Sequence, residues 1–373
     1  MAMQIRWGLI GLGRLAEEHL AGAFAASRNG RLVACVGRTA DRAREFAAKY
    51  GVGGPHGSYE RLVRDPGVDA VYVATPNHLH HPVVLAAAAA GKHVLCEKPM
   101  GLTTAEAEEM VGVCRRAGVL LGVGLQSRFQ HVLQAAAAVI REGRLGIVRE
   151  VSVQRYGPMR ASRSPWQMEL ATAGSGVLGG LGVHVIDFVH WIVGDRPVRV
   201  FGLAYPARAT GKPDENVTLV LEFAGGCQAI IRCGRNLPIG TNDLQAFGTR
   251  GMLATGPLRW GTTDRLTVKT VDGTEEREFP RENLYQREVE AFAEEVAGNR
   301  TTLTPGIASG EDGLWLARVT DALVRSFETG ALVPVEGQRC SLRPSAGQYP
   351  PLPPFGKSPL RPPLVKGGTG GFD

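Results

Sequence analysis

The stretch from Ile5 to Ala16, which reads IRWGLIGLGRLA, decides the fold. Its apolar first half is typical of a strand, and a helix is predicted over Leu15–Ala26. Between strand and helix, Gly11, Gly13 and Ala16 form a G-x-G-x-x-A pattern. The first glycine permits a tight turn, the second lets the backbone approach a pyrophosphate, and the alanine keeps the helix close to the sheet. We therefore predict a dinucleotide-binding turn, with a purely structural glycine turn as the alternative.

The same alternation of strand and helix continues as far as Leu125. The strand-like runs carry few polar residues, as expected of strands that are covered on both faces. Alternation at this spacing predicts a doubly wound parallel sheet, an α/β architecture with right-handed crossovers. Further strands are predicted at Arg31–Gly37, Ala70–Ala74, His93–Glu97 and Val119–Leu125, and further helices at Ala40–Tyr50, Pro82–Ala90 and Thr103–Ala117.

Beyond residue 125 most strand-like runs follow one another directly, which indicates an antiparallel sheet. We expect a Rossmann domain over residues 1–124, an α+β domain with a large, mostly antiparallel open sheet over 125–338, and a Pro/Gly-rich disordered tail over 339–373. A proline-rich ligand for a partner domain is the alternative for the tail. The strands are predicted at Val148–Tyr156, Val198–Leu203, Val217–Phe223, Cys227–Cys233, Leu244–Phe247, Met252–Ala254 and Leu266–Val271, and the helices at Val132–Arg141, Leu284–Ala297 and Gly310–Thr329.

The composition of the 373 residues excludes several kinds of partner. The net charge is +6, but the arginines are scattered, so we expect no nucleic-acid partner and a dinucleotide as the anionic ligand. No membrane-length apolar stretch and no signal-peptide pattern stand out. None of the six cysteines forms a C-x-x-C pair, which favours buried reduced thiols and a cytoplasmic protein.

The end of the second predicted strand distinguishes the two nicotinamide dinucleotides. NAD is held there by an acidic residue that bonds the ribose 2′-hydroxyl. This sequence has Gly37-Arg38-Thr39 instead, with Arg42 one turn further on. Arg38 can bind a 2′-phosphate, so the sequence favours NADP(H) over NAD(H). Solvated arginines at a helix start are the alternative.

A lysine ends the fourth predicted strand, in Glu97-Lys98-Pro99. The carboxyl edge of a doubly wound sheet is where ligands bind. A lysine there can hydrogen-bond a substrate hydroxyl and pass a proton while a hydride moves, and Glu97 can tune it by charge. An ordinary surface Lys–Glu pair is the alternative.

Three histidines follow the third predicted strand, within the segment from Thr75 to His81 (TPNHLHH). No cysteine or carboxylate is evident as a partner that would complete a zinc site. We therefore expect no metal and interpret the segment as a turn whose polar groups contact the cofactor.

Together these motifs resemble the Gfo/Idh/MocA family, the relatives of glucose–fructose oxidoreductase and inositol dehydrogenase. The resemblance spans residues 4–335 and rests on GLGRLA, ATPNHLHHP, CEKP, LQSRF, GSGVLGGLGVHVIDF and DGLWLARVTDALVRS in this order. It implies a homodimer or homotetramer assembled through the open C-terminal sheet. It also implies an NAD(P)-dependent dehydrogenase or reductase that acts on CH–OH groups of sugars, cyclic polyols or related small molecules.

The resemblance also implies a set of site residues. Lys98 would be the catalytic lysine, and His184 would give or take the proton. The cofactor would be lined by Gly11, Gly13, Arg14, Leu15, Arg38, Thr75, Pro76, Asn77, His80, Glu97, Lys98, Gln126 and Trp166. The substrate would be contacted by Lys98, Arg128, Gly180, His184 and Asp187.

The sequence departs from the family pattern at Gly180. Many family dehydrogenases have an aspartate four residues before the histidine, on the same helical face. Here Gly180 precedes His184, while Asp187 is retained, and Lys98 can supply the missing polar contact. Three alternatives stay open: a satisfied core histidine at 184, a non-catalytic NAD(P)-binding regulator, and a redox-neutral lyase or glycosidase that uses bound nicotinamide transiently.

Overall fold

The computed structural model of the chain describes residues 4–157, 164–235, 237, 240–258, 263–298 and 306–337. The tail predicted over 339–373, together with Cys340, lies outside the described residues. The five other cysteines are free and buried, as predicted.

The N-terminal part forms a six-stranded parallel sheet in the order β3-β2-β1-β4-β5-β6, which confirms the predicted doubly wound topology. The order reverses between β1 and β4, so the carboxyl ends of these two strands flank the crevice where ligands bind in such sheets. The strands are β1 (Ile5–Ile10), β2 (Gly30–Val36), β3 (Gly54–His56), β4 (Ala70–Val73), β5 (His93–Glu97) and β6 (Leu121–Gly124).

Helices cover both faces of this sheet, which explains why its strands are mostly apolar. The predicted first helix is present, but it starts as a π-helical turn (Ala16–Leu20) before α1. The short elements β3 and α3 escaped prediction because segments of this length carry too little periodicity. The helices are α1 (Ala21–Ala26), α2 (Ala40–Tyr50), α3 (Tyr59–Val63), α4 (His80–Ala89) and α5 (Thr104–Ala117).

The second sheet has nine strands in the order β14-β13-β12-β11-β7-β10-β9-β8-β15. All neighbours run antiparallel except β7 and β10, which confirms the predicted mostly antiparallel sheet. The polar strand β14 was not predicted, because an edge strand has no need of an apolar face. The strands are β7 (Val148–Tyr156), β8 (Pro197–Tyr205), β9 (Asn216–Phe223), β10 (Gln228–Gly234), β11 (Thr241–Gly248), β12 (Gly251–Thr255), β13 (Asp264–Thr270), β14 (Gly273–Phe279) and β15 (Val333–Pro334).

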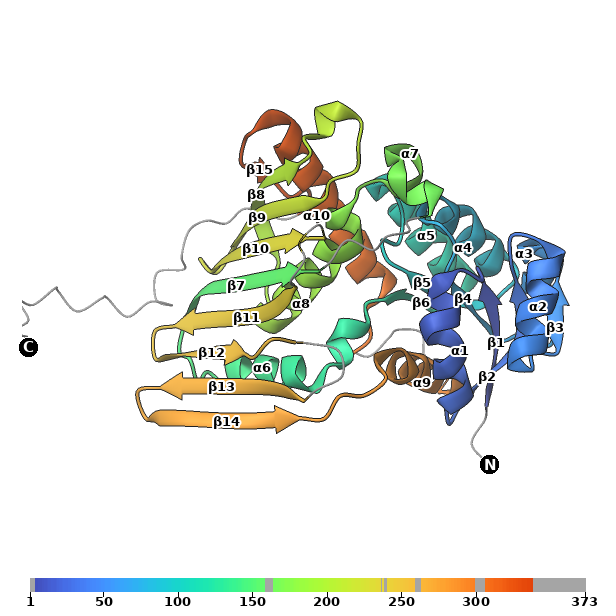
Figure 1. The fold of residues 1–373 in the computed structure, drawn as a ribbon, viewed down its shortest axis with the longest axis horizontal. Coiled ribbons are helices and arrows are strands. Elements are labelled where there is room, and N and C mark those ends of the chain that lie inside the picture. The colour runs from blue at the N-terminus through green and yellow to red at the C-terminus, as the bar shows by residue number, and fades with distance from the viewer. Residues whose placement is uncertain are drawn as a thin grey trace, which may run out of the picture.

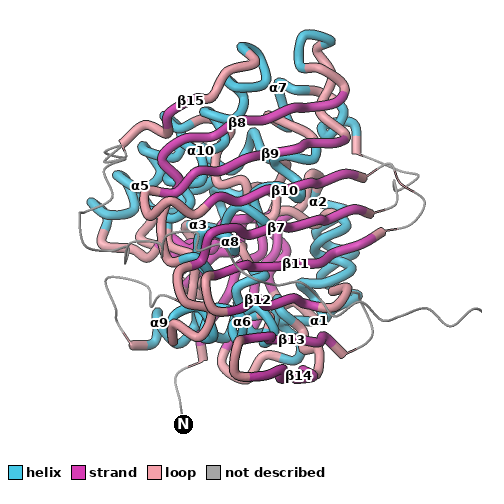
Figure 2. Tube along the Cα trace, turned by 90° about the vertical axis from the view of Figure 1, so that its left-hand side faces the viewer, coloured by secondary structure: helices cyan, strands magenta, loops and turns pink. Residues whose placement is uncertain are grey.

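Three helices fill the space between this sheet and the Rossmann unit (Figure 1). They are α6 (His131–Arg141), α8 (Val183–Val193) and α10 (Gly310–Thr329). Helix α10 packs against β8 on one side and α5 on the other, so it ties the two units together. The opposite face of the sheet is turned outward (Figure 2).

Helix α9 (Leu284–Ala297) lies beside α1 and β1, which belong to the opposite end of the chain (Figure 1). Its Phe292 ring packs against Trp7 of β1 with ring centroids 5.6 Å apart. The C-terminal part of the chain therefore helps to build the core of the Rossmann unit.

One segment, Leu170–Val193, is long and apolar enough to cross a membrane by length and composition. This corrects the expectation that no such stretch stands out. Its most apolar window is 67% buried inside the protein, which is the character of a core helix in a soluble protein. The segment comprises α7 (Leu170–Ala173), a π-helical turn (Leu178–Gly182) and α8.

Candidate active site

The glycine turn after β1 has the geometry that a dinucleotide requires. Gly11 has a φ of +105°, and a Cβ on it would lie 2.5 Å from the carbonyl carbon and oxygen of Ala74, so only glycine fits between the two turns. A Cβ on Gly13, in contrast, would meet no atom within 4 Å. Ala16 is fully buried against the sheet. The turn is therefore closely packed at Gly11 and open at Gly13, which we call its rim.

Two buried side-chain oxygens at the same edge have no hydrogen-bond partner among the described residues. They are Oγ1 of Thr75, which follows β4, and Oε1 of Gln126, which follows β6. A buried polar atom without a partner costs free energy, and a bound polar ligand removes that cost. Together with the open rim at Gly13, these oxygens fit a nicotinamide dinucleotide laid across the carboxyl ends of the strands.

Arg38 and Arg42, which follow β2, differ in their contacts. The Arg42 guanidinium donates to the backbone oxygen of Leu12 at 3.1 and 3.2 Å and pairs with Glu17, so it braces the glycine turn. Thr39 caps α2 by accepting a hydrogen bond from the Arg42 backbone N–H. Arg38, two residues after the end of β2, is exposed. Of the two, Arg38 is therefore the arginine that does not brace the turn.

Lys98 lies at the junction of the two units, where β5 ends. Its Nζ donates a hydrogen bond to the backbone oxygen of Gly180, 3.1 Å away. Burial lowers the pKa of Lys98 to about 8; Glu97 acts in the opposite direction, and the charges of Arg235 and Arg155 lower it further. The surrounding pocket is lined by Asn77, Lys98, Pro99, Trp166, Gln167, Ala173, Ser175, Gly176, Gly179, Gly180 and Arg235.

His80 holds together the two loops that carry this site. Its Nδ1 lies 2.8 Å from the Pro99 oxygen, and its Nε2 lies 3.0 Å from the Thr75 oxygen. Burial lowers the pKa of His80 to about 4, so the ring is neutral and a single N–H donates to one of the two carbonyls. Because His80 is buried, it positions Lys98 through the Pro99 backbone. No group of three or more metal-ligating side chains occurs in the described part of the chain.

Two buried carboxyl groups share the Tyr72 hydroxyl, and one of them, Glu97, directly precedes Lys98. The Tyr72 hydroxyl donates to Glu97 at 2.8 Å and lies 3.4 Å from Glu288 of α9. Burial raises the pKa of both carboxyl groups; the charge of Glu97 raises the pKa of Glu288 further, whereas Lys98 and the Tyr72 hydroxyl act to lower the pKa of Glu97. Glu288 was not predicted as a site residue. A charged residue on the buried face of an amphipathic helix, here between Tyr285 and Phe292, is the sequence pattern that could have identified it.

His184 is buried one helical turn beyond Gly180 and is not among the residues that line the pocket. Its Nδ1 has no partner among the described residues. Burial and the positive charges of Lys98, Arg155 and Arg235 lower the pKa of His184 well below its ordinary value, so the imidazole is neutral. A Cβ on Gly180 would overlap the Arg235 guanidinium, a residue that sequence reasoning also missed.

Arg128 and Asp187 were expected to contact substrate, but they contact each other. Arg128 donates to the two carboxylate oxygens of Asp187 at 2.6 and 2.9 Å, and to Asp312 of α10 at 3.1 Å. Arg128 and Asp187 are 2% and 1% exposed, and neither lines the pocket. This ion-pair cluster joins α8, α10 and the turn after β6, so its role is structural.

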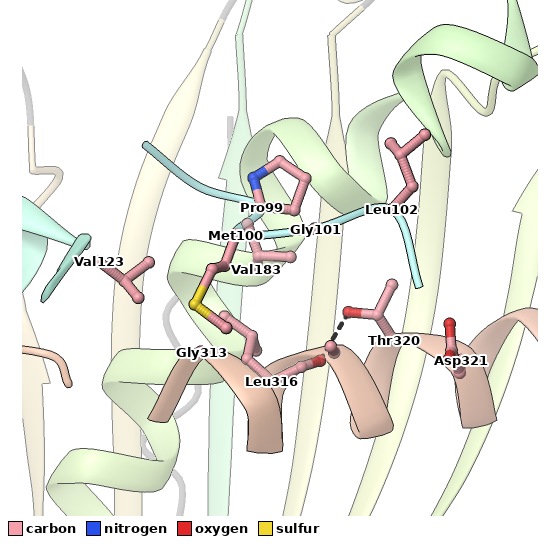
Figure 3. Close-up of a pocket in the computed structure, with 11 residues that line it drawn as sticks. Pro99, Met100, Gly101, Leu102, Val123, Val183, Gly313, Leu316, Thr320 and Asp321 are labelled. Carbon is pink, nitrogen blue, oxygen red and sulfur yellow. Dashed lines mark hydrogen bonds between the residues drawn. The ribbon is translucent and has the colours of Figure 1, made fainter. Parts of the chain in front are cut away.

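A second recess touches Pro99 from the side of α10 (Figure 3). Its walls are mainly apolar, with Met100 and Leu316 facing each other across it. Its one charged lining residue, Asp321, accepts hydrogen bonds from the backbone and hydroxyl of Thr104 at 3.0 and 2.6 Å. This recess is a packing seam that supports the loop after Lys98.

Comparison with known proteins identifies the family. The family described as "Oxidoreductase family, NAD-binding Rossmann fold" matches residues 5–125, and the "GFO/IDH/MocA C-terminal domain" matches residues 133–254. The chain belongs to the Gfo/Idh/MocA family. The family resemblance predicted from the sequence is thereby confirmed.

Similar proteins include 1,5-anhydro-D-fructose reductase of Ensifer adhaerens, 32% identical over 336 residues that cover 89% of this chain and 98% of that protein. Trans-1,2-dihydrobenzene-1,2-diol dehydrogenase of Mus musculus is 35% identical, with 74% and 80% covered. The structure of aldose-aldose oxidoreductase from Caulobacter crescentus complexed with glycerol has a TM-score of 0.80 at 29% identity, with 89% and 99% covered. This Gfo/Idh/MocA protein is thus an NAD(P)-dependent oxidoreductase, so the regulator alternative is no longer needed.

The Gfo/Idh/MocA site residues expected from the sequence occupy three places. Gly11, Gly13, Thr75 and Gln126 lie along the sheet edge, while Arg14 and Leu15 open the first helix, where Arg14 lies 3.7 Å from Glu18. Asn77, Lys98, Gly180 and Trp166 line the pocket, and Pro76 precedes Asn77, whose amide donates to the Ala173 oxygen at 3.0 Å. His80, Glu97, Arg128, His184 and Asp187 are buried behind these surfaces.

Proposed function

We propose that this enzyme transfers a hydride between NADP(H) and a secondary alcohol or ketone of a sugar-like molecule, and that Lys98 carries the proton. The observation that supports this most directly is the Lys98 ammonium, placed in a pocket beside the carboxyl edge of the Rossmann sheet. The activities named for the similar proteins, on an anhydrofructose and on a dihydrodiol, favour a substrate with a reacting hydroxyl or carbonyl group.

The protein's own share of the reaction follows from charge and position. The glycine turn would hold the pyrophosphate of the dinucleotide, whose nicotinamide would supply or accept the hydride. In the reducing direction, the Lys98 ammonium donates a hydrogen bond to the substrate carbonyl oxygen and passes its proton as negative charge develops there. In the oxidising direction, neutral Lys98 accepts the proton of the hydroxyl.

The electrostatics favour Lys98 over His184 as the proton carrier. Proton transfer is most effective when the pKa of the group lies near the working pH. The pKa of Lys98 is about 8, whereas that of His184 is well below its ordinary value. Our proposal therefore moves the proton-transfer role from His184, where the sequence placed it, to Lys98, and leaves His184 as a neutral neighbour.

The proposal is tested by fluorescence titration of the protein with NADPH and NADH, followed by turnover assays with sugars, inositols and keto-sugars. We expect cofactor binding and turnover of at least one hydroxyl or carbonyl compound. Failure to bind either dinucleotide at saturating concentration would refute the proposal. A product formed from a sugar with no net change in nicotinamide redox state would favour the lyase or glycosidase alternative.

Arg38→Asp is expected to reverse the cofactor preference. Loss of charge-assisted hydrogen bonds to the 2′-phosphate should raise the Kd for NADPH about 10- to 100-fold. The new carboxylate should at the same time strengthen NADH binding through the 2′-hydroxyl. The matched control is Arg31→Asp. Arg31 is an exposed arginine at the opposite end of β2, so its replacement should leave both Kd values unchanged. Equal effects of the two substitutions would contradict the assignment.

The pH dependence of kcat/KM reports the Lys98 proton. Because reduction needs the ammonium form, kcat/KM for a ketone should be level below a pH of about 8 and fall about tenfold per unit above it. Oxidation of the alcohol should show the opposite dependence. Arg235→Gln removes a neighbouring positive charge and should move the bend to higher pH. A bend unmoved by Arg235→Gln would argue against Lys98 as the titrating group.

We further propose that the protein is a cytoplasmic homo-oligomer that pairs through the outward face of its nine-stranded sheet (Figure 2). Large apolar side chains on that face support this: Leu203 and Tyr205 of β8 are 59% and 67% exposed, and Phe247 of β11 is exposed as well. The buried free cysteines are consistent with a reducing compartment.

A further inference from the structure

Two buried carboxyl groups, those of Glu97 at the end of β5 and Glu288 of α9, meet at one phenol hydroxyl. Both side chains are buried, and Tyr72 between them is fully buried. The Tyr72 oxygen lies 2.8 Å from Oε1 of Glu97 and 3.4 Å from Oε2 of Glu288. Like charges this close in a buried site oppose each other's ionisation. One of the two carboxyl groups is therefore expected to carry a proton.

The hydrogen bonds around Tyr72 indicate which carboxyl group that is. A phenol hydroxyl has one proton to donate. The shorter contact, to Glu97, takes this proton, since short hydrogen bonds to an ionised acceptor are the strongest. The Tyr72 oxygen can then accept a hydrogen bond from Glu288 if the Glu288 carboxyl is protonated. The order of donors that satisfies both contacts thus runs from Glu288 to Tyr72 and from Tyr72 to Glu97.

The charges around the two carboxyl groups favour the same order. Burial raises the pKa of Glu97, but the positive charge of Lys98 acts to lower it, and Glu97 also accepts the Lys98 backbone N–H at 3.3 Å. Burial raises the pKa of Glu288 well above its ordinary value, and the negative charges of Glu97 and Asp187 raise it further. Glu97 is thus the carboxyl group that ionises first.

We propose that Glu288 is a positioning residue that carries a proton, donates it in a hydrogen bond to Tyr72 and thereby keeps Glu97 the ionised partner of Lys98. The Glu97 carboxylate favours the ammonium form of Lys98, which is the form that donates a proton in reduction. The proton on Glu288 is not transferred during the reaction. This inference deepens the proposed function and rests on Lys98 as the proton carrier.

Infrared spectroscopy of the resting protein tests whether the pair holds a proton. The C=O band of a protonated carboxyl group is absent from a carboxylate, and exposed carboxyl groups are ionised at neutral pH. The spectrum of the wild type minus that of Glu288→Gln should contain this band. The matched control is Glu290→Gln, because Glu290 is a buried glutamate of the same helix that pairs with Arg28 at 2.9 Å and is ionised. Its difference spectrum should lack the band.

The titration of Lys98 tests which carboxyl group holds the proton. It is followed by 13C NMR of protein labelled at the lysine Cε, where the Lys98 resonance is identified by its absence in Lys98→Met. Glu288→Gln offers Tyr72 an N–H in place of the O–H, so the titration midpoint of Lys98 should stay at the wild-type pH. Glu288→Leu offers no donor, which weakens the hydrogen bond to Glu97 and should lower the midpoint by about half a pH unit. Glu290→Leu should leave it unchanged.

The other titratable groups around this site are the same in all these variants. A change in the Lys98 midpoint therefore comes from position 288. The groups that act on Lys98 or are acted on by it are Glu97, His80, Arg155, His184 and Arg235, and those that face Glu288 are Glu97, Tyr72, Asp187 and Tyr285.

Four results would overturn the proposal. A wild type minus Glu288→Gln spectrum without the acid band would mean that both carboxyl groups are ionised. A Lys98 midpoint raised by Glu288→Gln would place the proton on Glu97 in the wild type, since Glu97 would ionise only in the variant. Equal lowering by Glu288→Gln and Glu288→Leu would show that Glu288 acts through negative charge. An unchanged midpoint in Glu288→Leu would remove Glu288 from the control of Lys98.

Both measurements are made without turnover, so they separate this inference from the proposed function. The expected spectra and midpoints in a protein that transfers no hydride would support the role of Glu288 and refute the proposed function. Lys98-dependent hydride transfer combined with any of the four contrary results would have the opposite meaning.

Discussion

Lys98→Met should reduce kcat/KM for both directions of hydride transfer by about a thousandfold, at the centre of the range for removal of a positioned acid–base group. The methionine keeps the length of the side chain but cannot polarise a carbonyl or carry a proton. NADPH binding should persist, because the glycine turn and Arg38 remain. Steady-state kinetics and fluorescence titration measure the two effects separately.

Two further variants define the role of Lys98. Lys98→Arg preserves the positive charge, but a guanidinium does not release its proton near neutral pH. This variant should therefore retain substrate binding and lose turnover. Lys269→Met, on the distant strand β13, should behave as the wild type. A Lys98→Met enzyme that turned over at the wild-type rate would remove Lys98 from the mechanism.

Arg128→Met should lower the free energy of unfolding by about 3–5 kcal/mol, since it leaves the Asp187 carboxylate buried without its partner. Denaturant unfolding followed by fluorescence measures this loss. The effect is one of stability: Arg128 lies outside the pocket lining. Folded enzyme at low temperature should therefore keep most of its activity.

The controls for Arg128 compare buried with exposed charge. Arg115 pairs with Glu311 at the surface, with 72% and 56% of the side chains exposed, so Arg115→Met should cost less than about 1 kcal/mol. Adding Asp187→Leu to Arg128→Met should restore part of the lost stability, because it removes the stranded charge. Similar losses for Arg115→Met and Arg128→Met would contradict the interpretation.

Local patterns in the chain were sufficient to predict much of the fold and part of the site. The glycine turn at Gly11, the apolar strands of the Rossmann sheet and the alternating strands of the second sheet depend on periodicity and turn chemistry within a few residues. Lys98 was predicted because the end of a parallel strand is itself a functional position. Elements without apolar periodicity, such as β14, were missed.

The chain alone thus determined the dinucleotide turn, the two kinds of sheet and the lysine at the strand end, since each is encoded by neighbouring residues. Only the tertiary structure paired Arg128 with Asp187, brought Glu288 to the Tyr72 hydroxyl and placed Arg235 against Gly180. These contacts join residues that are more than fifty positions apart in the sequence. Local sequence patterns cannot predict which distant side chains will come into contact. At the pocket, burial and the charges of residues as far away in the sequence as Arg235 decide the pKa of Lys98.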